Sequence, residues 1–315
     1  LPHGVEWGYS WDKDALWERW LREREKPSSL MVLARNPYML LMLTQVYADQ
    51  GDLPDNRGEL FRQFVETLLL RENIAQRDAA KQIKLSADAQ QLIDGLCQVA
   101  YTMQIQRSQA QDGNAVTVLP ASDVRQHLDE RTLYLAGSTS ILTIGEEVRF
   151  SHQLLQEYFA ARYMQTAIFS PRPEGEGPGV RALQATDIWP PERWWDRTNW
   201  EEATILLAGL YSDDITPVID WLQDAQPEVA AQCINRSGAN TPNTTLEKLR
   251  AAWIPRLTNE QRDPDPRARA AVGRALGQLT LRGEPLDNRT GVSVKRVGSS
   301  GSRVKSAKNH VNRTK

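Results

Sequence analysis

His152 is the residue of this sequence best placed to bind a ligand, because it lies where a helix is expected to begin. Ser151 can cap a helix that continues through Met164. The first turn of a helix carries unpaired backbone N–H groups and the positive end of the helix dipole, so an anion such as phosphate is favoured there. An imidazole at that end adds one more hydrogen-bond donor. The alternative interpretation is that His152 only caps or packs at the helix start.

The other histidines and the two cysteines do not have the spacing of a metal site or a catalytic triad. Cys97 and Cys233 lie far apart, each within an apolar helical pattern, which favours thiols in a reducing compartment over a disulfide. We therefore expect structural roles for the three other histidines, which are His3, His127 and His310.

The sequence contains no phosphate-binding loop of the form G-x-x-x-x-G-K-[ST], and no apolar strand that ends in paired acidic residues able to hold magnesium. Without such a loop, the lysine and the amides that cradle the β- and γ-phosphates of ATP are missing. We expect this chain alone to bind ATP poorly and to hydrolyse none, and we predict no catalytic residue and no metal ligand.

Length and charge narrow the possible partners. The chain of 315 residues is long enough for two domains, and its net charge of -2 and pI near 6.2 give no general reason to bind nucleic acid or an anionic membrane. No apolar run approaches the roughly 18 residues of a membrane-spanning helix. These features predict a cytoplasmic protein without a membrane partner. The chain opens at Leu1, in the middle of a pattern, which suggests a fragment of a longer protein.

Apolar residues at helical spacing predict a mainly α fold in the first half of the chain. Asn36-Pro37 should interrupt the second helix, because proline removes a backbone donor. Ser122 or Asp123 could cap the fifth helix. The expected helices span residues 12–24, 29–47, 59–71, 86–105 and 121–129.

The pattern then changes from helical to strand spacing. Residues 139–144 are rich in β-forming side chains, 145–147 can form a tight turn, and 148–150 return as a second short strand. Helices followed by a small β-hairpin wing indicate a winged-helix subdomain, which we predict here.

The second half of the chain is expected to be helical throughout. Short helices with apolar stripes, separated by proline, aspartate and glycine, are typical of an α-solenoid, whose units bury their apolar faces by stacking on their neighbours. A Pro/Gly-rich loop at 171–179 precedes them, and a tail at 291–315 with seven basic and no acidic residues is expected to be disordered. The expected helices span residues 201–211, 215–223, 228–235, 245–257 and 266–279.

Four tryptophans lie within residues 189–200, interleaved with prolines and arginines. They could bind a ligand by stacking or by cation–π contacts. The interpretation that we favour is structural: large apolar side chains seal the first helices of the solenoid against the winged helix. The four are Trp189, Trp194, Trp195 and Trp200.

Three segments of the chain resemble a known family. LARNPYMLL at 33–41, LPDNRGELF at 53–61 and VRFSHQLLQEYFAA at 148–161 together resemble the back half of NACHT-domain ATPases of the STAND class, and DPDPRAR at 263–269 is similar to the start of a HEAT-repeat helix. The resemblance implies that Pro37 lies near the adenine and that His152 is a sensor of the ADP phosphate. It also implies that ATP or ADP is bound in the intact parent protein, whose N-terminal nucleotide-binding domain this sequence lacks.

The resemblance gives a functional prediction and its rivals. We expect the nucleotide-state-sensing and partner-binding part of a signal-transducing ATPase, with a protein ligand or effector on the solenoid and oligomer formation on activation. One alternative is a non-catalytic α-solenoid scaffold for protein interactions. A DNA-binding winged helix is less favoured, because residues 53–162 hold 11 basic and 14 acidic side chains and the wing tip is acidic. The predicted domains are a helical subdomain remnant at 1–52, the winged helix at 53–170, a linker at 171–186, HEAT-like repeats at 187–290 and the basic tail at 291–315.

Overall fold

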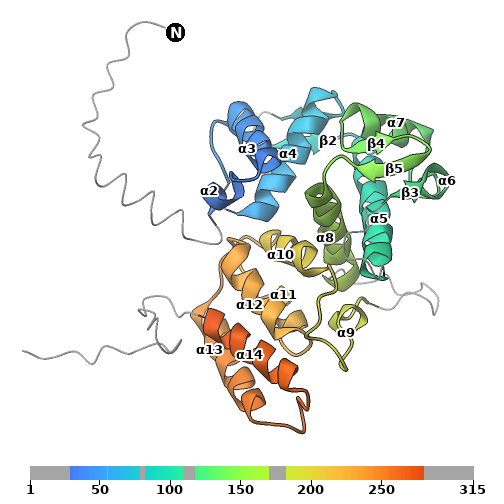
Figure 1. Ribbon diagram of the computed structural model, residues 1–315. Helices are drawn as coiled ribbons and strands as arrows, with labels where there is room; N and C mark the ends of the chain where they lie inside the picture. The colour runs from blue at the N-terminus through green and yellow to red at the C-terminus, as the bar shows by residue number, and fades with distance from the viewer. Residues whose placement is uncertain (1–28, 55, 79–81, 110–117, 170–181, 280–315) are drawn as a thin grey trace, which may run out of the picture. The chain divides into compact units, whose positions relative to one another are not determined.

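Helices dominate the protein, as the sequence predicts. The computed structural model describes residues 29–54, 56–78, 82–109, 118–169 and 182–279, and within these ranges the chain is mainly α with two small antiparallel sheets (Figure 1). The expected helix at 12–24, the loop at 171–179 and the tail at 291–315 lie outside the described residues.

The predicted break at Asn36-Pro37 is confirmed. Helix α2 (Leu30–Leu33) ends just before it and helix α3 (Pro37–Gln50) begins with the proline. The side chain of Asn36 accepts hydrogen bonds from the first amides of α3, and proline suits the first helical position because no donor is needed there. Gly51, at a φ of 80°, ends the helix in the left-handed region.

Helix α4 (Arg57–Arg71) and helix α5 (Ala87–Gln109) match the expected helices at 59–71 and 86–105. Between them lies a hairpin that the sequence did not suggest. Strands β1 (Ala75–Arg77) and β2 (Ile83–Leu85) pair antiparallel over three residues each. They are too short and too polar to show the alternation by which strands are recognised.

The helix expected at 121–129 is wrong in length and in its cap. Helix α6 (Ala121–Val124) is a single turn that starts after Pro120, and the hydroxyl of Ser122 bonds Asp123 instead of a helix amide. Asp129 caps a second helix, α7 (Glu130–Ser138), by accepting the Thr132 amide at 2.8 Å. The sequence interpretation took this aspartate for the end of one helix, whereas it begins another.

The predicted hairpin is confirmed and gains a third strand. Strand β5 (Glu147–Phe150) lies between β3 (Leu119–Pro120) and β4 (Leu142–Ile144), and both partners run antiparallel to it. β4 begins three residues later than expected, because Thr139 closes α7 and Ser140 adopts a positive φ.

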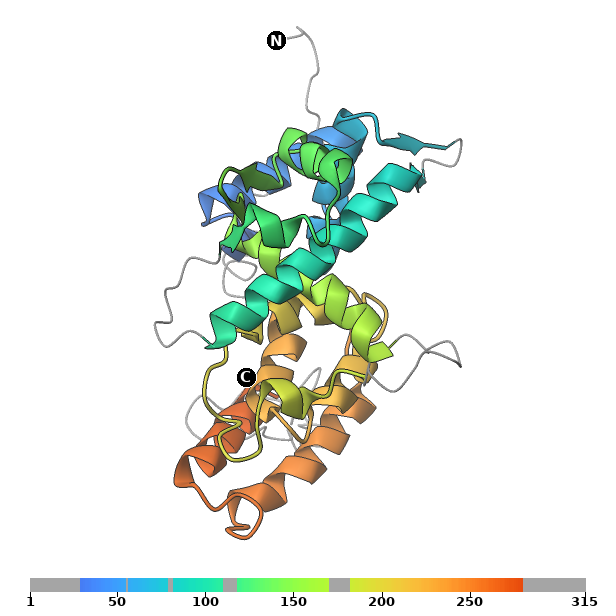
Figure 2. The same cartoon turned by 90° about the vertical axis from the view of Figure 1, so that its right-hand side faces the viewer.

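Helix α8 (Gln153–Phe169) follows the hairpin directly and is the centre of the packing. It lies along α5, as Figures 1 and 2 both show, and it also contacts α4, β5 and a later helix, α10 (Glu201–Gly209). Tyr158 and Phe159 are fully buried on it, in ring contact with Phe61 and Phe150 respectively. It starts one residue later and ends five residues later than the expected helix, which was to follow Ser151 and continue through Met164.

The five helices predicted in the second half are all present. Helix α10 (Glu201–Gly209) packs on α8 and on α12 (Pro227–Arg236), and α12 packs on α11 (Thr216–Leu222) and on α14 (Pro266–Gln278), so the alternate helices α10, α12 and α14 cover one another. The helix expected at 245–257 changes to a 3₁₀ turn where Pro255 interrupts it. A short helix, α9 (Ala185–Ile188), was not expected. The others are α10 (Glu201–Gly209), α11 (Thr216–Leu222), α12 (Pro227–Arg236), α13 (Asn243–Trp253), η1 (Ile254–Leu257) and α14 (Pro266–Gln278).

Candidate functional site

The two residues that the sequence singled out lie at the starts of two helices. Pro37 is exposed at the first position of α3. His152 precedes the first residue of α8: its backbone carbonyl accepts the Leu155 amide at 3.0 Å, and its Nδ1 accepts the Leu154 amide at 3.1 Å. His152, and not Ser151, is therefore the capping residue, and the simpler role that the sequence allowed for this histidine is present in the structure.

A ring stack joins these two helix starts. Tyr38, the neighbour of Pro37, lies face to face with His152, with ring centroids 3.9 Å apart and planes inclined by 2°. Phe64 of α4 meets the same tyrosine edge-on at 6.3 Å. The Tyr38 hydroxyl shares a hydrogen bond with Ser151; burial raises the pKa of Tyr38 to about 12, and this bond opposes the rise. Segments 114 positions apart in the sequence (152 minus 38) thus meet at one point.

The hydrogen bond from the Leu154 amide determines which ring nitrogen of the imidazole carries the proton. A nitrogen that accepts an N–H bond has no proton, so neutral His152 carries its proton on Nε2. Burial lowers the pKa of His152, which favours this neutral form. Nε2 lies on the far side of the ring from Nδ1, so this donor points away from the Leu154 amide. The expectation that the imidazole and the helix amides aim at one anion therefore does not hold for that amide.

The rest of the 148–161 motif connects α8 to other helices. Gln156 donates to the Gln104 side chain of α5 at 3.1 Å, and Gln104 in turn donates to the carbonyl of Asn199, just before α10. Glu157 accepts hydrogen bonds from Arg107 at 2.8 Å and from Gln153 at 2.7 Å. Its side chain is only 3% exposed. Gln153, Gln156 and Glu157 were not among the predicted site residues, although they belong to the 148–161 motif from which His152 was predicted.

Glu157 has an unusual charge environment. Burial raises its pKa, against the bonds from Gln153 and Arg107, and the charge of Glu202 raises it further. Glu202 is the carboxylate that binds two arginines, Arg57 of α4 at 2.9 Å and Arg236 of α12 at 2.6 Å. Through these two ion pairs, Glu202 of α10 connects the segment at 53–61, which contains Arg57, to helix α12.

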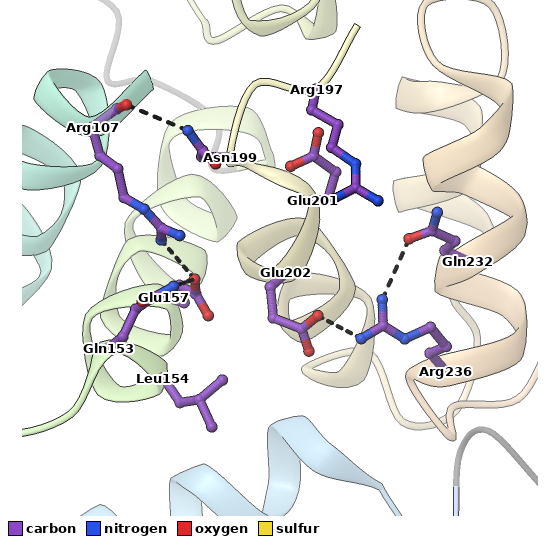
Figure 3. A pocket seen from close by; sticks show the side chains of 10 residues that line it. All are labelled: Arg107, Gln153, Leu154, Glu157, Arg197, Asn199, Glu201, Glu202, Gln232 and Arg236. Atoms are coloured by element: carbon purple, nitrogen blue, oxygen red, sulfur yellow. Dashed lines mark hydrogen bonds and ion pairs between the residues drawn. The ribbon is translucent and has the colours of Figure 1, made fainter. Parts of the chain in front are cut away.

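These charged groups line a polar cleft of about 400 Å³ (Figure 3). Arg107 and Glu157 lie on one side of it, Gln232 and Arg236 on the other, and α10 and the segment just before it supply the groups between them. The lining holds three arginines and three glutamates, so the formal charges of the cleft balance. The lining consists of Arg107, Gln153, Leu154, Glu157, Arg197, Asn199, Glu201, Glu202, Gln232 and Arg236.

The segment at 53–61 also makes a close backbone-to-backbone contact between two helices. Gly58 of α4 lies against Gly209 of α10, where a Cβ added to Gly58 would come within 2.4 Å of backbone carbon. Beside it, the Arg57 amide donates to the carbonyl of Ser237 at 3.3 Å. Only glycine allows backbones to approach this closely, which gives the segment a packing role that sequence reasoning missed.

The four tryptophans contact different parts of the protein. Trp200 contacts Tyr101 of α5 at a centroid distance of 5.5 Å, as expected for a seal against the predicted winged helix. Trp194 instead stacks under Arg256 at 5.0 Å, and Trp195 meets Arg267 at 5.5 Å, so these two face the last helices of the chain. Trp189 is buried beside Trp221. The cation–π partners are therefore the protein's own arginines.

The remaining candidates have local roles where the structure describes them. His127 pairs with Gln98 through Nδ1 at 2.9 Å, while His3 and His310 lie outside the described residues. Cys97 and Cys233 are buried; burial raises the pKa of Cys97 to about 12 and that of Cys233 as well. The described part of the chain contains no group of His, Cys, Asp and Glu that could hold a metal ion.

Comparison with known proteins gives no family. No protein-family model matches the chain, and no curated protein matches its sequence. Among the helices that the structure describes, none has the length and apolarity to cross a membrane.

Proposed function

We propose that this chain is the nucleotide-state-sensing and partner-binding part of a NACHT-type, STAND-class switch ATPase. The single observation that carries the proposal is the stack of Tyr38 on His152. It brings the Asn36-Pro37 turn and the histidine motif to one point, as a nucleotide contacted by both segments would require. The chain senses the nucleotide and does not hydrolyse it, since its sequence has no phosphate loop.

The local architecture supports the assignment of the parts. Helices α5, α6 and α7, followed by the β4–β5 hairpin with β3 alongside, have the order of a winged helix. The succession α10, α12 and α14, each packed on the next, supports HEAT-like repeats that carry a protein ligand or effector. In this proposal His152 contacts the ADP phosphate and Pro37 lies near the adenine, both with a nucleotide-binding domain that precedes them in the parent.

Coupling between nucleotide and partner follows from the position of α8. A switch needs an element whose contacts differ between two states. His152 stands at the start of α8, while Gln156 and Glu157 on its next turn bond toward α5 and the segment before α10. A displacement of His152 is therefore passed along α8 to groups that contact α5 and, through Gln104, the residue before α10.

The first test is the coding sequence upstream of Leu1, read in the same frame. The proposal expects a phosphate loop and an acidic strand within about one domain length, roughly 100–200 residues. A start codon at or just before Leu1 overturns it. In that case the second candidate, a free-standing interaction scaffold, follows from the stacked helices α10, α12 and α14 alone.

A second test uses the parent protein if that sequence exists. His152→Ala should speed the release of bound ADP, and His127→Ala is the matched control, because His127 has a local partner on α5. Equal ADP release by both variants and the unchanged protein contradicts the sensor role.

A further inference from the structure

Three interactions hold His152 and the residue before it, and two of them involve Tyr38. The phenol ring covers one face of the imidazole at 3.9 Å, and the Tyr38 hydroxyl is bonded to Ser151, the residue just before His152. The third contact is the Leu154 amide on Nδ1. A side chain held over its face and at one edge has little freedom to rotate about its terminal torsion.

Tyr38 is itself held from behind. Its backbone amide is bound by the Asn36 side chain at 2.9 Å, and Phe64 meets its ring edge-on. The phenol ring is therefore supported at its edge by Phe64 and at its hydroxyl by Ser151. The parallel phenol ring excludes water from that face of the imidazole, and burial away from water favours the neutral ring over the charged one.

We propose that Tyr38 is the positioning residue of this site: its ring holds His152 so that Nδ1 accepts the Leu154 amide and Nε2–H remains as the donor for a bound anion. Only the identity of the anion that Nε2–H binds rests on the proposed function. The positioning itself is a property of the free protein. It assigns to the tyrosine, and not to Pro37, the contact through which the α3 turn acts on the histidine.

The test measures the tautomer of His152 directly in the full chain. Histidine is labelled with ¹⁵N, and two-bond ¹H–¹⁵N spectra report which ring nitrogen carries the proton; His152→Gln identifies the signal. The unchanged protein should show Nε2–H as the dominant form, with a pKa below the ordinary 6.5. Tyr38→Leu should give a mixture of tautomers and a pKa that rises toward that value, because the covering ring is lost.

Two further variants separate positioning from general stability. Tyr38→Phe retains the ring and removes only the Ser151 bond, so it should keep the dominant Nε2–H form. Tyr47→Leu is the matched control, since Tyr47 lies on the same helix and is 58% exposed. It should leave the tautomer and the pKa unchanged.

The proposal is overturned if Tyr38→Leu keeps the tautomer and pKa of the unchanged protein, or if Tyr47→Leu alters them equally. Because no nucleotide enters the measurement, this result is independent of the sensor role. Suppose that Tyr38→Leu loses the tautomer preference while His152→Ala does not change ADP release in the parent. The positioning role of Tyr38 would then stand, and the proposed sensor function would be wrong.

Discussion

Gly58 and Gly209 meet backbone to backbone, so that a Cβ on Gly58 would lie 2.4 Å from the carbonyl carbon of Gly209. Real side chains do not tolerate such a distance, and the neighbour here is backbone that cannot rotate away. The contact joins α4 to α10 next to the Arg57–Glu202 ion pair. It therefore holds the segment at 53–61 against α10, the first of the five predicted C-terminal helices.

Gly58→Ala should destabilise the protein by about 1–3 kcal/mol, the usual cost of forcing extra volume into a tight contact. Urea unfolding followed by circular dichroism measures the change. Gly277→Ala is the control: it is also a helical glycine, but an added Cβ meets nothing within 4 Å. That variant should gain about 0.5–1 kcal/mol from helix propensity. A loss in both variants would place the cause outside the Gly58 contact.

The pair of Arg256 and Asp263 is the most buried ion pair described, with side chains 3% and 2% exposed and two hydrogen bonds of 2.8 Å. Asp263→Ala leaves the guanidinium buried over the Trp194 ring without its carboxylate, which should cost about 3–5 kcal/mol. Thermal unfolding measures this loss.

The matched control for this pair is Asp220→Ala, which breaks an exposed ion pair with Lys248. Since exposed pairs contribute about 0–1 kcal/mol, the control should change little. A small effect of Asp263→Ala, comparable to that of the control, would mean that the Arg256 charge finds water or another acceptor when its partner is removed.

Local features of this protein were predictable from sequence, and its tertiary contacts were not. The break at Pro37 and the β4–β5 hairpin depend on residues a few positions apart, so their patterns are visible in the chain. Asp129 misled because aspartate both ends and begins helices, and only the following Thr132 amide decides which. The β1–β2 hairpin was not predicted, because strands of three residues are too short to show the alternation of apolar and polar side chains.

The candidate site shows the same limit. The motif pointed to His152 and to the α3 turn, but the partner that touches the histidine is Tyr38, a choice that depends on how α3 and α8 pack. Glu157 and Arg107 are 50 positions apart, and Gly58 and Gly209 are 151 apart. Pairing at such distances follows from the fold, and no period in the sequence marks it.

The buried Glu157 predicts a specific pH dependence of stability. Its folded pKa lies above the ordinary 4.5, with burial as the largest cause. The folded protein therefore binds this proton more tightly than the unfolded chain, so the stabilising contribution is fully present below pH 4.5 and is lost as pH rises through the raised value. The stability of the unchanged protein minus that of Glu157→Gln should fall over this range. A difference that is constant with pH contradicts the raised pKa.

His152 predicts the opposite dependence. Its folded pKa lies below the unfolded value of 6.5, with burial as the cause. The neutral ring is the form that accepts the Leu154 amide, so the unfolded chain binds the proton more readily. The contribution of His152 is therefore present above pH 6.5 and is lost as pH falls through the lowered pKa.

Unfolding by urea at a series of pH values between 7.5 and 5 should reveal this loss as a falling stability relative to His152→Asn. Asparagine keeps a capping acceptor for the Leu154 amide and does not titrate, so the comparison isolates the imidazole proton. His127→Asn is the second reference: its stability relative to the unchanged protein, measured over the same series, shows what another histidine contributes. If the difference for His152→Asn stays flat below pH 6.5, the imidazole accepts its proton as readily in the folded protein as in the unfolded chain, and Nδ1 does not hold the Leu154 amide in solution.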